Sequence, residues 1–241
     1  MSDLHILTAG QPIPTDPGYA VLVDKPKGLS SFGVIRRLRR FLGVKKIGHA
    51  GTLDPMATGL LICLVGRTAT REQDRFMGLP KEYTGTIRLG ETTASYDAEA
   101  EILDVVSMHG APSAAEMEEA RQHFLGEIDQ VPPIYSAIKQ GGERLYKKAR
   151  RGEDVEIKPR RVTVTRFQVS EERQEKPGTF DVDIEVACSK GTYIRSLAHD
   201  FGQALGVGGH LVALRREAIG EHRVADAWTI EGLEVATRPG D

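Results

Sequence analysis

The order of strand and helix patterns is the feature that most constrains the fold of this chain. Residues 160–169 and 179–188 both alternate apolar and polar side chains, as strands with one buried face do. The second pattern runs through a Ser-Lys-Gly segment at 189–191 into residues 192–206, where apolar side chains recur at helical spacing. Strands and helices therefore mix without a regular strand–helix–strand rhythm. The sequence predicts an α+β fold with a mixed or antiparallel sheet, not a doubly wound one.

Two further helices are predicted by their ends as much as by their periodicity. Residues 30–43 carry an apolar stripe, with Ser30 or Ser31 as the N-terminal cap and Gly43 as the residue that ends the helix. Residues 113–126 begin with a Ser-x-x-Glu capping box and end at a glycine. Both segments are therefore expected to be helical along their whole length.

Strands are expected at residues 19–24 and 83–89, while the apolar run at 60–66 fits a buried strand or another short buried segment. The chain of 241 residues, 40% hydrophobic and 27% charged, has the composition of an ordinary soluble protein. We expect one domain over residues 1–241. The sequence shows no run long enough to span a membrane and no signal peptide.

The cysteines and histidines give no sign of a metal site or a disulfide. Cys63 and Cys188 are isolated, so the simplest interpretation is two buried free thiols in a reducing compartment, which agrees with a cytoplasmic location. The seven histidines show no metal-binding spacing, and the chain has no phosphate-binding glycine loop. No metal and no cofactor are therefore expected.

Charge is segregated along the chain although the net charge is only −2. Residues 25–53 hold eight Lys or Arg and no acid, and residues 139–161 hold nine Lys or Arg against four acids. Between them, residues 91–129 hold ten acids and a single Arg. Two basic segments that flank an acidic one indicate a polarised surface whose positive side faces a polyanion such as nucleic acid.

The stretch HAGTLDPMATGLL, at residues 49–61, contains one ionisable carboxylate, Asp54, among small and apolar residues. Pro55 follows and disfavours a helix at Asp54. Burying an ionised carboxylate without a partner is costly. Asp54 is therefore either a turn residue that faces water, or a group held there for chemistry with a partner elsewhere in the chain.

Other candidates allow two interpretations each. Arg195, near the start of a helix, is either a surface ion-pair residue or the guanidinium that keeps a buried carboxylate charged. Tyr83 and Tyr193 are either half-buried aromatics or platforms on which RNA bases stack.

Five motifs together resemble a known family. DKPKGLSS, GHAGTLDPMATGLL, KEYTGTIRLG, CSKGTYIRSLAHD and HLVALRR occur in this order, and the chain resembles the TruB-type tRNA pseudouridine synthases from about residue 21 to 216. The basic segment at about 130–160 resembles the insertion with which that family grips RNA. The resemblance implies a central mixed sheet flanked by helices, with a cleft across it. Only about 25 residues follow Arg216, so no C-terminal PUA domain is expected.

The resemblance assigns catalytic roles to three residues. Asp54 matches the nucleophilic aspartate, and Arg195 matches the arginine that pairs with it. Tyr83 matches the tyrosine that stacks on the target base. The remaining residues expected to bind the substrate are His49 beside the extruded nucleotide, Tyr193 in the pocket wall and Leu214 as an apolar contact.

The implied function is isomerisation of a uridine in RNA to pseudouridine, with uridine 55 of the tRNA T-loop as the target after base flipping. The T-arm of tRNA is the expected partner of a monomeric enzyme. The residues expected to contact the RNA backbone are Arg36, Arg37, Arg40, Lys147, Lys148, Arg150 and Arg151.

Two points of function stay open at this level. Asp54 is expected to attack either C1′ of the ribose or C6 of the uracil. An RNA chaperone that refolds tRNA without modifying it would use the same basic surfaces. A hydrolase with an aspartate nucleophile is disfavoured, because no second catalytic carboxylate is evident near Asp54.

Overall fold

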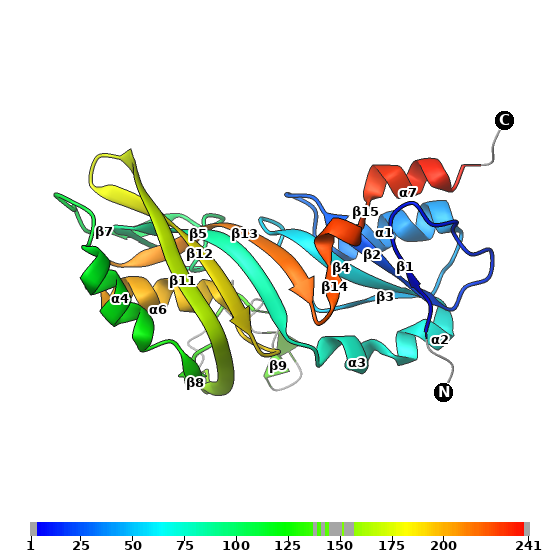
Figure 1. Ribbon diagram of the computed structural model, residues 1–241, viewed down its shortest axis with the longest axis horizontal. Coiled ribbons are helices and arrows are strands. Elements are labelled where there is room, and N and C mark those ends of the chain that lie inside the picture. The colour runs from blue at the N-terminus through cyan, green and yellow to red at the C-terminus, as the bar shows by residue number, and fades with distance from the viewer. Residues whose placement is uncertain (1–3, 137–138, 141–142, 145–150, 152–156, 239–241) are drawn as a thin grey trace. The chain divides into compact units, whose positions relative to one another are not determined.

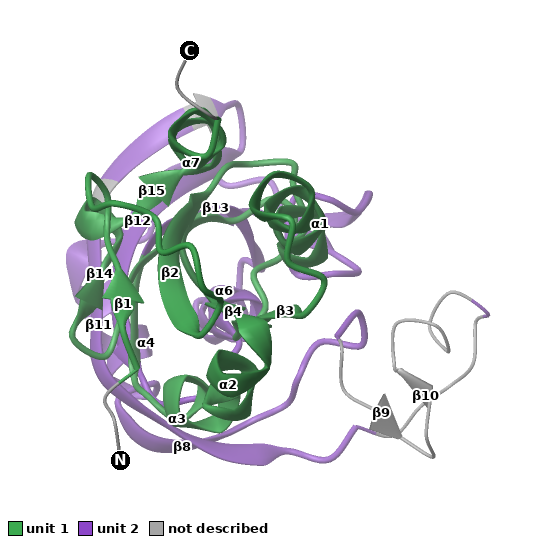
Figure 2. Cartoon of the chain, turned by 90° about the vertical axis from the view of Figure 1, so that its right-hand side faces the viewer, with its two compact units in different colours: residues 1–83, 214–241 green, residues 84–213 purple. Residues whose placement is uncertain are grey.

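The structure is a computed structural model, and the residues it describes are 4–136, 139–140, 143–144, 151 and 157–238. The chain divides into two compact units (Figure 2). Unit 1 comprises residues 1–83 and 214–241, and unit 2 comprises residues 84–213. Two strands, β5 (Lys81–Leu89) and β13 (Gly209–Ile219), have residues in both units. The expectation of one catalytic domain over the whole chain stays a prediction.

The described residues of unit 1 form strands and helices, of which α1 is the longest helix (Figure 1). In chain order they are β1 (Ile6–Leu7), β2 (Tyr19–Lys25), α1 (Ser31–Leu42), β3 (Ile47–Ala50), β4 (Thr58–Val65), α2 (Gly66–Arg71), α3 (Gln73–Met77), the start of β5, the end of β13, β14 (His222–Arg223), a 3-10 turn at Val224–Asp226, β15 (Trp228–Thr229) and α7 (Ile230–Ala236).

The sheet of unit 1 is mixed. Strand β2 pairs with β4 in antiparallel register, and with β1 and β15 in parallel register. Strand β4 also pairs antiparallel with β3, and it pairs parallel with β13 through Thr58 opposite Arg215 and Gly59 opposite Arg216. The mixed sheet expected from the sequence is confirmed.

Helices cover both faces of this sheet, which explains the continuous apolar runs of β2 and β4. Alternate residues of the two strands face α1 and α7: Tyr19, Val21, Val23, Leu61, Cys63 and Val65. The residues between them face α2 and α3: Ala20, Leu22, Leu60, Ile62 and Leu64. The run at 60–66 is thus a strand buried on both sides, and for that reason its periodicity did not distinguish the alternatives.

Helix α1 has the predicted caps. The Ser30 hydroxyl accepts a hydrogen bond from the Gly33 N–H at 3.0 Å, and Gly43 ends the helix with a φ of 66°. Arg39, on the same helix, bends back and donates to the Ile47 carbonyl at 3.1 Å. This hydrogen bond ties α1 to β3.

In the part of unit 2 that the structure describes, a long hairpin packs with the helices α4 and α6 (Figure 1). Its elements are the end of β5, β6 (Glu91–Thr93), β7 (Ile102–Val105), α4 (Ala114–Gln122), β8 (Gly126–Gln130), β9 (Lys139–Gln140), β10 (Glu143–Arg144), β11 (Arg160–Lys176), β12 (Thr179–Cys188), α6 (Ile194–Ala204) and the start of β13.

The hairpin of β11 and β12 turns at residues 177–178 and is antiparallel, and β11 pairs antiparallel with β8 on its other edge. Three aromatic rings join α6 and the turn after α4 to this sheet. The ring centroids of Phe167 and Phe201 lie 5.4 Å apart, and Phe124 meets them edge-on at 6.3 and 6.4 Å. The alternation that predicted both strands therefore follows from one face packing on helices.

Helix α4 is shorter than predicted. The capping box of Ser113 and Glu116 is present, but the helix ends at Gln122 rather than at Gly126. The N–H groups of the next three residues bond the carbonyl three positions back, which tightens the chain into turns. Gly126, with a φ of 82°, starts β8 instead of ending the helix.

The structure tests two further predictions, on the cysteines and on membrane-spanning segments. Cys63 and Cys188 are both free and buried, as expected, and burial raises the pKa of the Cys63 thiol. In the ranges that the structure describes, no helix has both the length and the apolar character needed to cross a membrane.

The close pairing of β4 with β13 gives a test of the fold. Gly59 has a φ of 101°, and an added Cβ would lie 2.3 Å from the Arg216 carbonyl oxygen. We expect Gly59→Ala to lower the free energy of unfolding by about 3–5 kcal/mol, because strain and a backbone clash add. Gly10, with a φ of 83° and open space around it, is the matched control, and Gly10→Ala is expected to cost about 1–2 kcal/mol. Equal losses in urea unfolding would contradict this packing.

Candidate active site

Asp54 lies in the loop of residues 51–57 that joins β3 to β4. The Ala57 N–H donates to the Asp54 carbonyl at 3.1 Å, so Asp54 is the first residue of a turn with Pro55 second. Leu53 and Met56 are buried, whereas the Asp54 side chain is half-buried. The turn expected of an Asp-Pro pair is present, and the full burial suggested by the apolar sequence is not.

The Ser31 hydroxyl fixes the residue before Asp54. Its Oγ accepts from the Leu53 N–H at 2.8 Å and donates to the Leu53 carbonyl at 3.0 Å. Both Ser31 and Leu53 are buried, so this hydroxyl satisfies two backbone groups that no strand pairs. The first residue of α1 thereby holds the loop in place.

Lys25 fixes the residue after Asp54. This lysine is fully buried at the end of β2, and its Nζ donates to the carbonyls of Pro26 at 3.0 Å, Leu29 at 2.7 Å and Pro55 at 3.4 Å. The Gly28 N–H also donates to the Pro55 carbonyl, at 2.8 Å. A buried ammonium is tolerated only with such partners, so its position is strongly determined.

Arg216 ties together the two ends of the loop. It is only 1% exposed, and its guanidinium donates to the carbonyls of Gly51 at 3.1 Å and Leu60 at 2.8 Å. The planar guanidinium reaches both groups at once, which an ammonium cannot do with the same geometry. Three side chains from β2, α1 and β13 therefore determine the path of the backbone around Asp54.

His49, five residues before Asp54, is neutral at pH 7. Burial and then the positive charge of Arg216 lower the pKa of its imidazole. Its Nδ1 is buried and has no hydrogen-bond partner among the described residues, while its backbone carbonyl accepts from Gln73 at 3.0 Å. Leu214 lies beside the loop, since its carbonyl accepts a long bond of 3.5 Å from the Thr58 hydroxyl.

Arg195 lies in unit 2 and is buried, which excludes the interpretation as a surface ion-pair residue. It is the second residue of α6 and 5% exposed. Its Nη1 donates to the Ser95 carbonyl at 3.0 Å and lies 3.3 Å from Asp97 Oδ2, and its Nη2 donates to the Tyr135 carbonyl at 3.0 Å. Asp97 is a carboxylate that the sequence did not single out.

Asp97 is itself held by its neighbours. Its Oδ1 accepts from the Ser95 hydroxyl at 2.5 Å and from the Glu99 N–H at 3.0 Å. Asp97 is only 2% exposed, so its ion pair with Arg195 is desolvated. Buried pairs of this kind fix geometry more than they add stability.

Tyr193 is the N-terminal cap residue of α6 and is positioned by Gln130. The Gln130 side chain accepts from the Tyr193 N–H at 2.8 Å and donates to the Tyr193 carbonyl at 3.0 Å. The Arg160 guanidinium lies 5.4 Å from the centre of the Tyr193 ring. Tyr83, on β5, is buried with 9% exposure.

The basic residues expected on the RNA surface are only partly described. Arg36 is exposed on α1 and makes no ion pair with any described residue, whereas Arg37 pairs with Glu231 at 3.7 Å and Arg40 with Glu234 at 3.1 Å. Figure 1 shows α7, which carries both glutamates, beside α1. Arg151 is exposed. The other residues of that set, Lys147, Lys148 and Arg150, lie outside the described residues.

The predicted site residues therefore belong to two groups. Unit 1 holds His49, Asp54, Tyr83 and Leu214, and unit 2 holds Tyr193 and Arg195.

The sequence analysis missed the residues that support both groups. Three of them had a signal, because Lys25 and Ser31 belong to the motif DKPKGLSS and Arg216 belongs to HLVALRR. Asp97 had none, since it stands in an acidic region without a motif, and Gln130 had only its place at the start of the segment 130–160 that resembles the RNA-gripping insertion.

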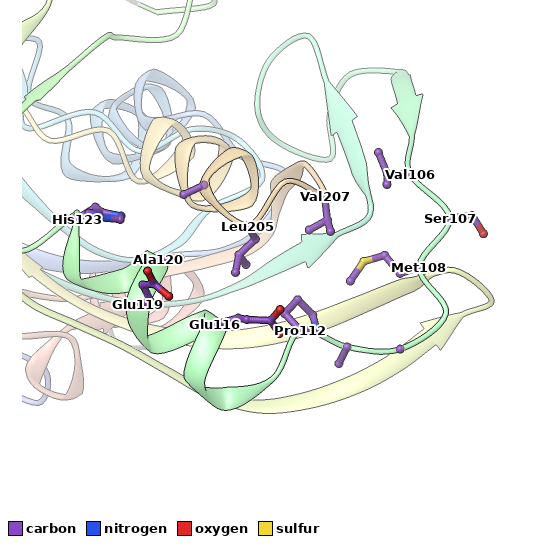
Figure 3. A pocket seen from close by; sticks show the side chains of 13 residues that line it. Val106, Ser107, Met108, Pro112, Glu116, Glu119, Ala120, His123, Leu205 and Val207 are labelled. Atoms are coloured by element: carbon purple, nitrogen blue, oxygen red, sulfur yellow. The ribbon is translucent and has the colours of Figure 1, made fainter.

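A cavity of about 540 Å³ lies elsewhere in unit 2 (Figure 3). Its lining mixes apolar residues such as Met108, Leu205 and Val207 with polar ones such as Glu119 and His123. None of the predicted site residues lines it. Within the described part of the chain, no group of three or more histidine, cysteine or acidic side chains is placed to bind a metal.

Comparison with known proteins identifies the family. A model described as the TruB family pseudouridylate synthase N-terminal domain matches residues 39–194, and one described as the tRNA pseudouridylate synthase B C-terminal domain matches residues 195–239. These two matches cover most of the chain. The chain therefore belongs to the TruB family of pseudouridylate synthases, which are isomerases.

Individual relatives agree with this assignment. The tRNA pseudouridine synthase B of Arthrobacter sp. (strain FB24) is 51% identical over 216 residues, which cover 88% of this chain and 69% of the relative. The protein of that name from Opitutus terrae is 47% identical over 219 residues, which cover 91% of this chain and 88% of the relative.

Solved structures support the fold. A chain in the crystal structure of a Cbf5–Nop10–Gar1 complex is 28% identical with a TM-score of 0.65, and the match covers 90% of this chain and 53% of that one. A chain in the structure of an H/ACA RNP bound to a substrate RNA containing 2′-deoxyuridine is 26% identical with a TM-score of 0.62 and similar coverage. This chain spans about half of each, and it has the pseudouridine synthase fold.

Asp200, on α6, provides a test of the electrostatics. Burial raises the pKa of its carboxyl to about 6, above the ~3.9 of an unfolded aspartate. The folded state binds the proton more tightly, so the free energy of unfolding falls as pH rises from about 4 to about 6. With allowance for partial exposure, Asp200→Asn is expected to raise the free energy of unfolding by about 1–2 kcal/mol at neutral pH.

Urea unfolding of both proteins at neutral pH and near about pH 4 measures this difference, which is expected to vanish at the acidic value. Glu127→Gln, at an exposed site on β8, is the control for loss of a carboxylate. A destabilised Asp200→Asn variant at neutral pH would mean that the charged form is favoured in the folded protein.

Proposed function

We propose that this protein converts uridine 55 in the T-loop of tRNA to pseudouridine, with Asp54 as the nucleophile. The observation that carries the proposal is the loop at residues 51–57. It presents one half-buried carboxylate while three buried side chains hold the backbone around it. The relatives named tRNA pseudouridine synthase B support tRNA as the substrate. The position within the tRNA rests on the resemblance of the motifs.

The chemistry needs one nucleophile and no net oxidation. Asp54 attacks C1′ of the ribose or C6 of the uracil, and the bond between N1 and C1′ breaks. The base turns, a bond forms between C5 and C1′, and the bond to Asp54 breaks, which releases the free carboxylate. The proton on C5 then leaves and N1 gains one, so atoms and electrons balance without a cofactor.

The other residues bind and orient. In this proposal Arg195 keeps Asp54 ionised, since an adjacent cation favours the charged carboxylate. Tyr83 stacks on the flipped base, and Tyr193 and Leu214 close the pocket around it. His49, with its lowered pKa, contacts the RNA as a neutral imidazole.

The basic residues compensate for flipping the base, which costs a few kcal/mol. Arg36 is available for a phosphate, and the surface ion pairs of Arg37 and Arg40 are weak enough to be exchanged for phosphate contacts. The segment that includes Lys147, Lys148, Arg150 and Arg151 adds to this surface in the proposal. In the proposal, the protein acts as a monomer in the cytoplasm.

The proposed nucleophile gives the central mutational prediction. Asp54→Asn keeps the shape of the side chain and removes its charge, so turnover is expected to become undetectable while the affinity for tRNA changes less than about threefold, because phosphate contacts dominate binding. Release of tritium from tRNA labelled at C5 of uracil measures turnover directly. Sequencing for pseudouridine identifies the position that reacts.

The same assay separates the enzyme from a pure RNA chaperone, which would release no tritium with the unchanged protein. The matched control is Asp24→Asn. Asp24 is another carboxylate of unit 1, and it pairs with Arg215 at 2.8 Å outside the Asp54 loop. Turnover by Asp54→Asn at more than about a hundredth of the normal rate would show that the loop has a structural role only.

The proposed RNA surface predicts a change in salt dependence. Each phosphate that a protein neutralises contributes about 0.7–0.9 to the slope of log affinity against log salt. Arg36→Gln is expected to weaken tRNA binding and to reduce the slope by about that amount. Arg166→Gln removes an exposed arginine on β11 and is the control. Equal slopes for Arg36→Gln and the unchanged protein would place the RNA contacts elsewhere.

A further inference from the structure

Tyr96 has a strained backbone. Its φ is 62°, and no other non-glycine residue among those described has a positive φ. For a residue with a large side chain this conformation is a genuine outlier, because the Cβ is crowded by its own backbone. Such conformations persist where surrounding contacts hold them, and they concentrate at functional sites.

Two sets of contacts hold Tyr96 in this conformation. Its ring stacks on the His199 imidazole, with ring centres 3.9 Å apart and planes within 13° of parallel. Its carbonyl accepts from the Leu211 N–H at 3.0 Å, and the Ala98 N–H donates to the Leu211 carbonyl at 3.0 Å. The residues on both sides of Asp97 are therefore fixed to β13.

The strained residue brings two acceptors to one guanidinium nitrogen. Arg195 Nη1 lies 3.0 Å from the Ser95 carbonyl and 3.3 Å from the Asp97 carboxylate. Ser95 and Asp97 flank Tyr96, so the dihedral angles of Tyr96 determine whether both reach the same nitrogen. An ordinary conformation at this residue would turn the Ser95 carbonyl away.

The stack acts on the same face of α6 as the ion pair. Arg195 and His199 are four residues apart in this helix, so their side chains lie one above the other. The segment 95–97 consequently holds α6 at two points. Asp97 and the Ser95 carbonyl hold Arg195, and the Tyr96 ring holds His199.

The His199 ring is suited to packing at this position. Burial lowers the pKa of its imidazole, although a hydrogen bond to the Gly209 backbone opposes the shift, so the ring is neutral at pH 7. Its Nδ1 is buried without a hydrogen-bond partner among the described residues. The stack on the Tyr96 ring and the hydrogen bond to the Gly209 backbone together determine the position of this side chain.

We propose that the stacked pair Tyr96–His199 is a positioning device that fixes the orientation of the Arg195 guanidinium. The proposal rests on the role of Arg195 in the proposed function. In this proposal, neither Tyr96 nor His199 touches the substrate. It predicts that losing the stack slows the chemical step while tRNA binding and the fold are retained.

The test compares variants that keep the stack with variants that remove it. Tyr96→Phe and His199→Phe keep two stacked rings and are expected to retain kcat within about threefold. Tyr96→Gly relieves the backbone strain but removes the ring, and His199→Leu removes the stack from the other side. Both are expected to lower kcat at least about tenfold while KM and the Kd for tRNA stay within about twofold.

A purely structural role predicts a different pattern. Because glycine adopts a positive φ without strain, Tyr96→Gly would then retain normal kcat, and that result would overturn the proposal. Loss of kcat in Tyr96→Phe equal to that in Tyr96→Gly would also overturn it. If Tyr96→Gly does not fold, His199→Leu decides, because it leaves the backbone of residues 95–97 unchanged.

Two further measurements separate this proposal from the proposed function. In an Arg195→Lys background, Tyr96→Gly is expected to cause no additional loss of kcat, because the group being positioned is already changed. NMR of the Arg195 guanidinium protons is independent of activity. We expect distinct, slowly exchanging signals in the unchanged protein and in Tyr96→Phe, and averaged signals in Tyr96→Gly. Identical guanidinium spectra in all three proteins would overturn the positioning role even if the enzyme is inactive.

Discussion

Buried backbone groups in the loop of residues 51–57 must find hydrogen-bond partners, and this constraint shapes unit 1. The loop lies between two strands of the sheet but pairs with neither, so its polar groups depend on side chains. Lys25, Ser31 and Arg216 supply those bonds from three different elements. Removing the Ser31 hydroxyl, for example, would take away the partner of both the N–H and the carbonyl of buried Leu53, which is more costly than losing an ordinary contact.

This arrangement separates positioning from reactivity. The three supporting side chains act on the backbone around Asp54, while the Asp54 side chain is only half-buried at the turn. Unit 2 follows the same principle in a different way. Arg195 is fixed by two backbone carbonyls and by Asp97, whose carboxylate is held by further bonds. Groups fixed before the substrate binds need no reorganisation during the reaction, which is the main physical requirement of an electrostatic site.

Local sequence signals predicted much of the fold. The caps of α1 at Ser30 and Gly43 and the alternation in β12 each depend on residues close in sequence, and the structure confirms them. The sequence did not decide whether residues 60–66 form a strand, because helices cover both faces of β4 and this removes the alternation of apolar and polar residues. The predicted end of α4 at Gly126 was wrong, because the segment after Gln122 tightens into turns before Gly126.

Residues of the candidate site could be predicted only where they belong to a recognisable sequence motif. Asp54 was identified by its unusual setting, and its neighbours followed from the resemblance of five motifs to a family. The partner of Arg195 within unit 2 was missed because Asp97 is about a hundred positions away and lies in an acidic segment. Contacts between residues so distant in sequence depend on topology, which composition and periodicity do not determine.

Hydrogen exchange at the Leu53 amide tests most directly whether the Asp54 loop is held in advance of RNA binding. In the absence of RNA, this N–H donates to the buried Ser31 hydroxyl at 2.8 Å. We predict protection comparable to that of the amides in the centre of β4, which open only with the unit as a whole. Ser31→Ala is expected to lower that protection selectively. Exchange of the Leu53 amide at the rate of an exposed loop in the unchanged protein would contradict the account.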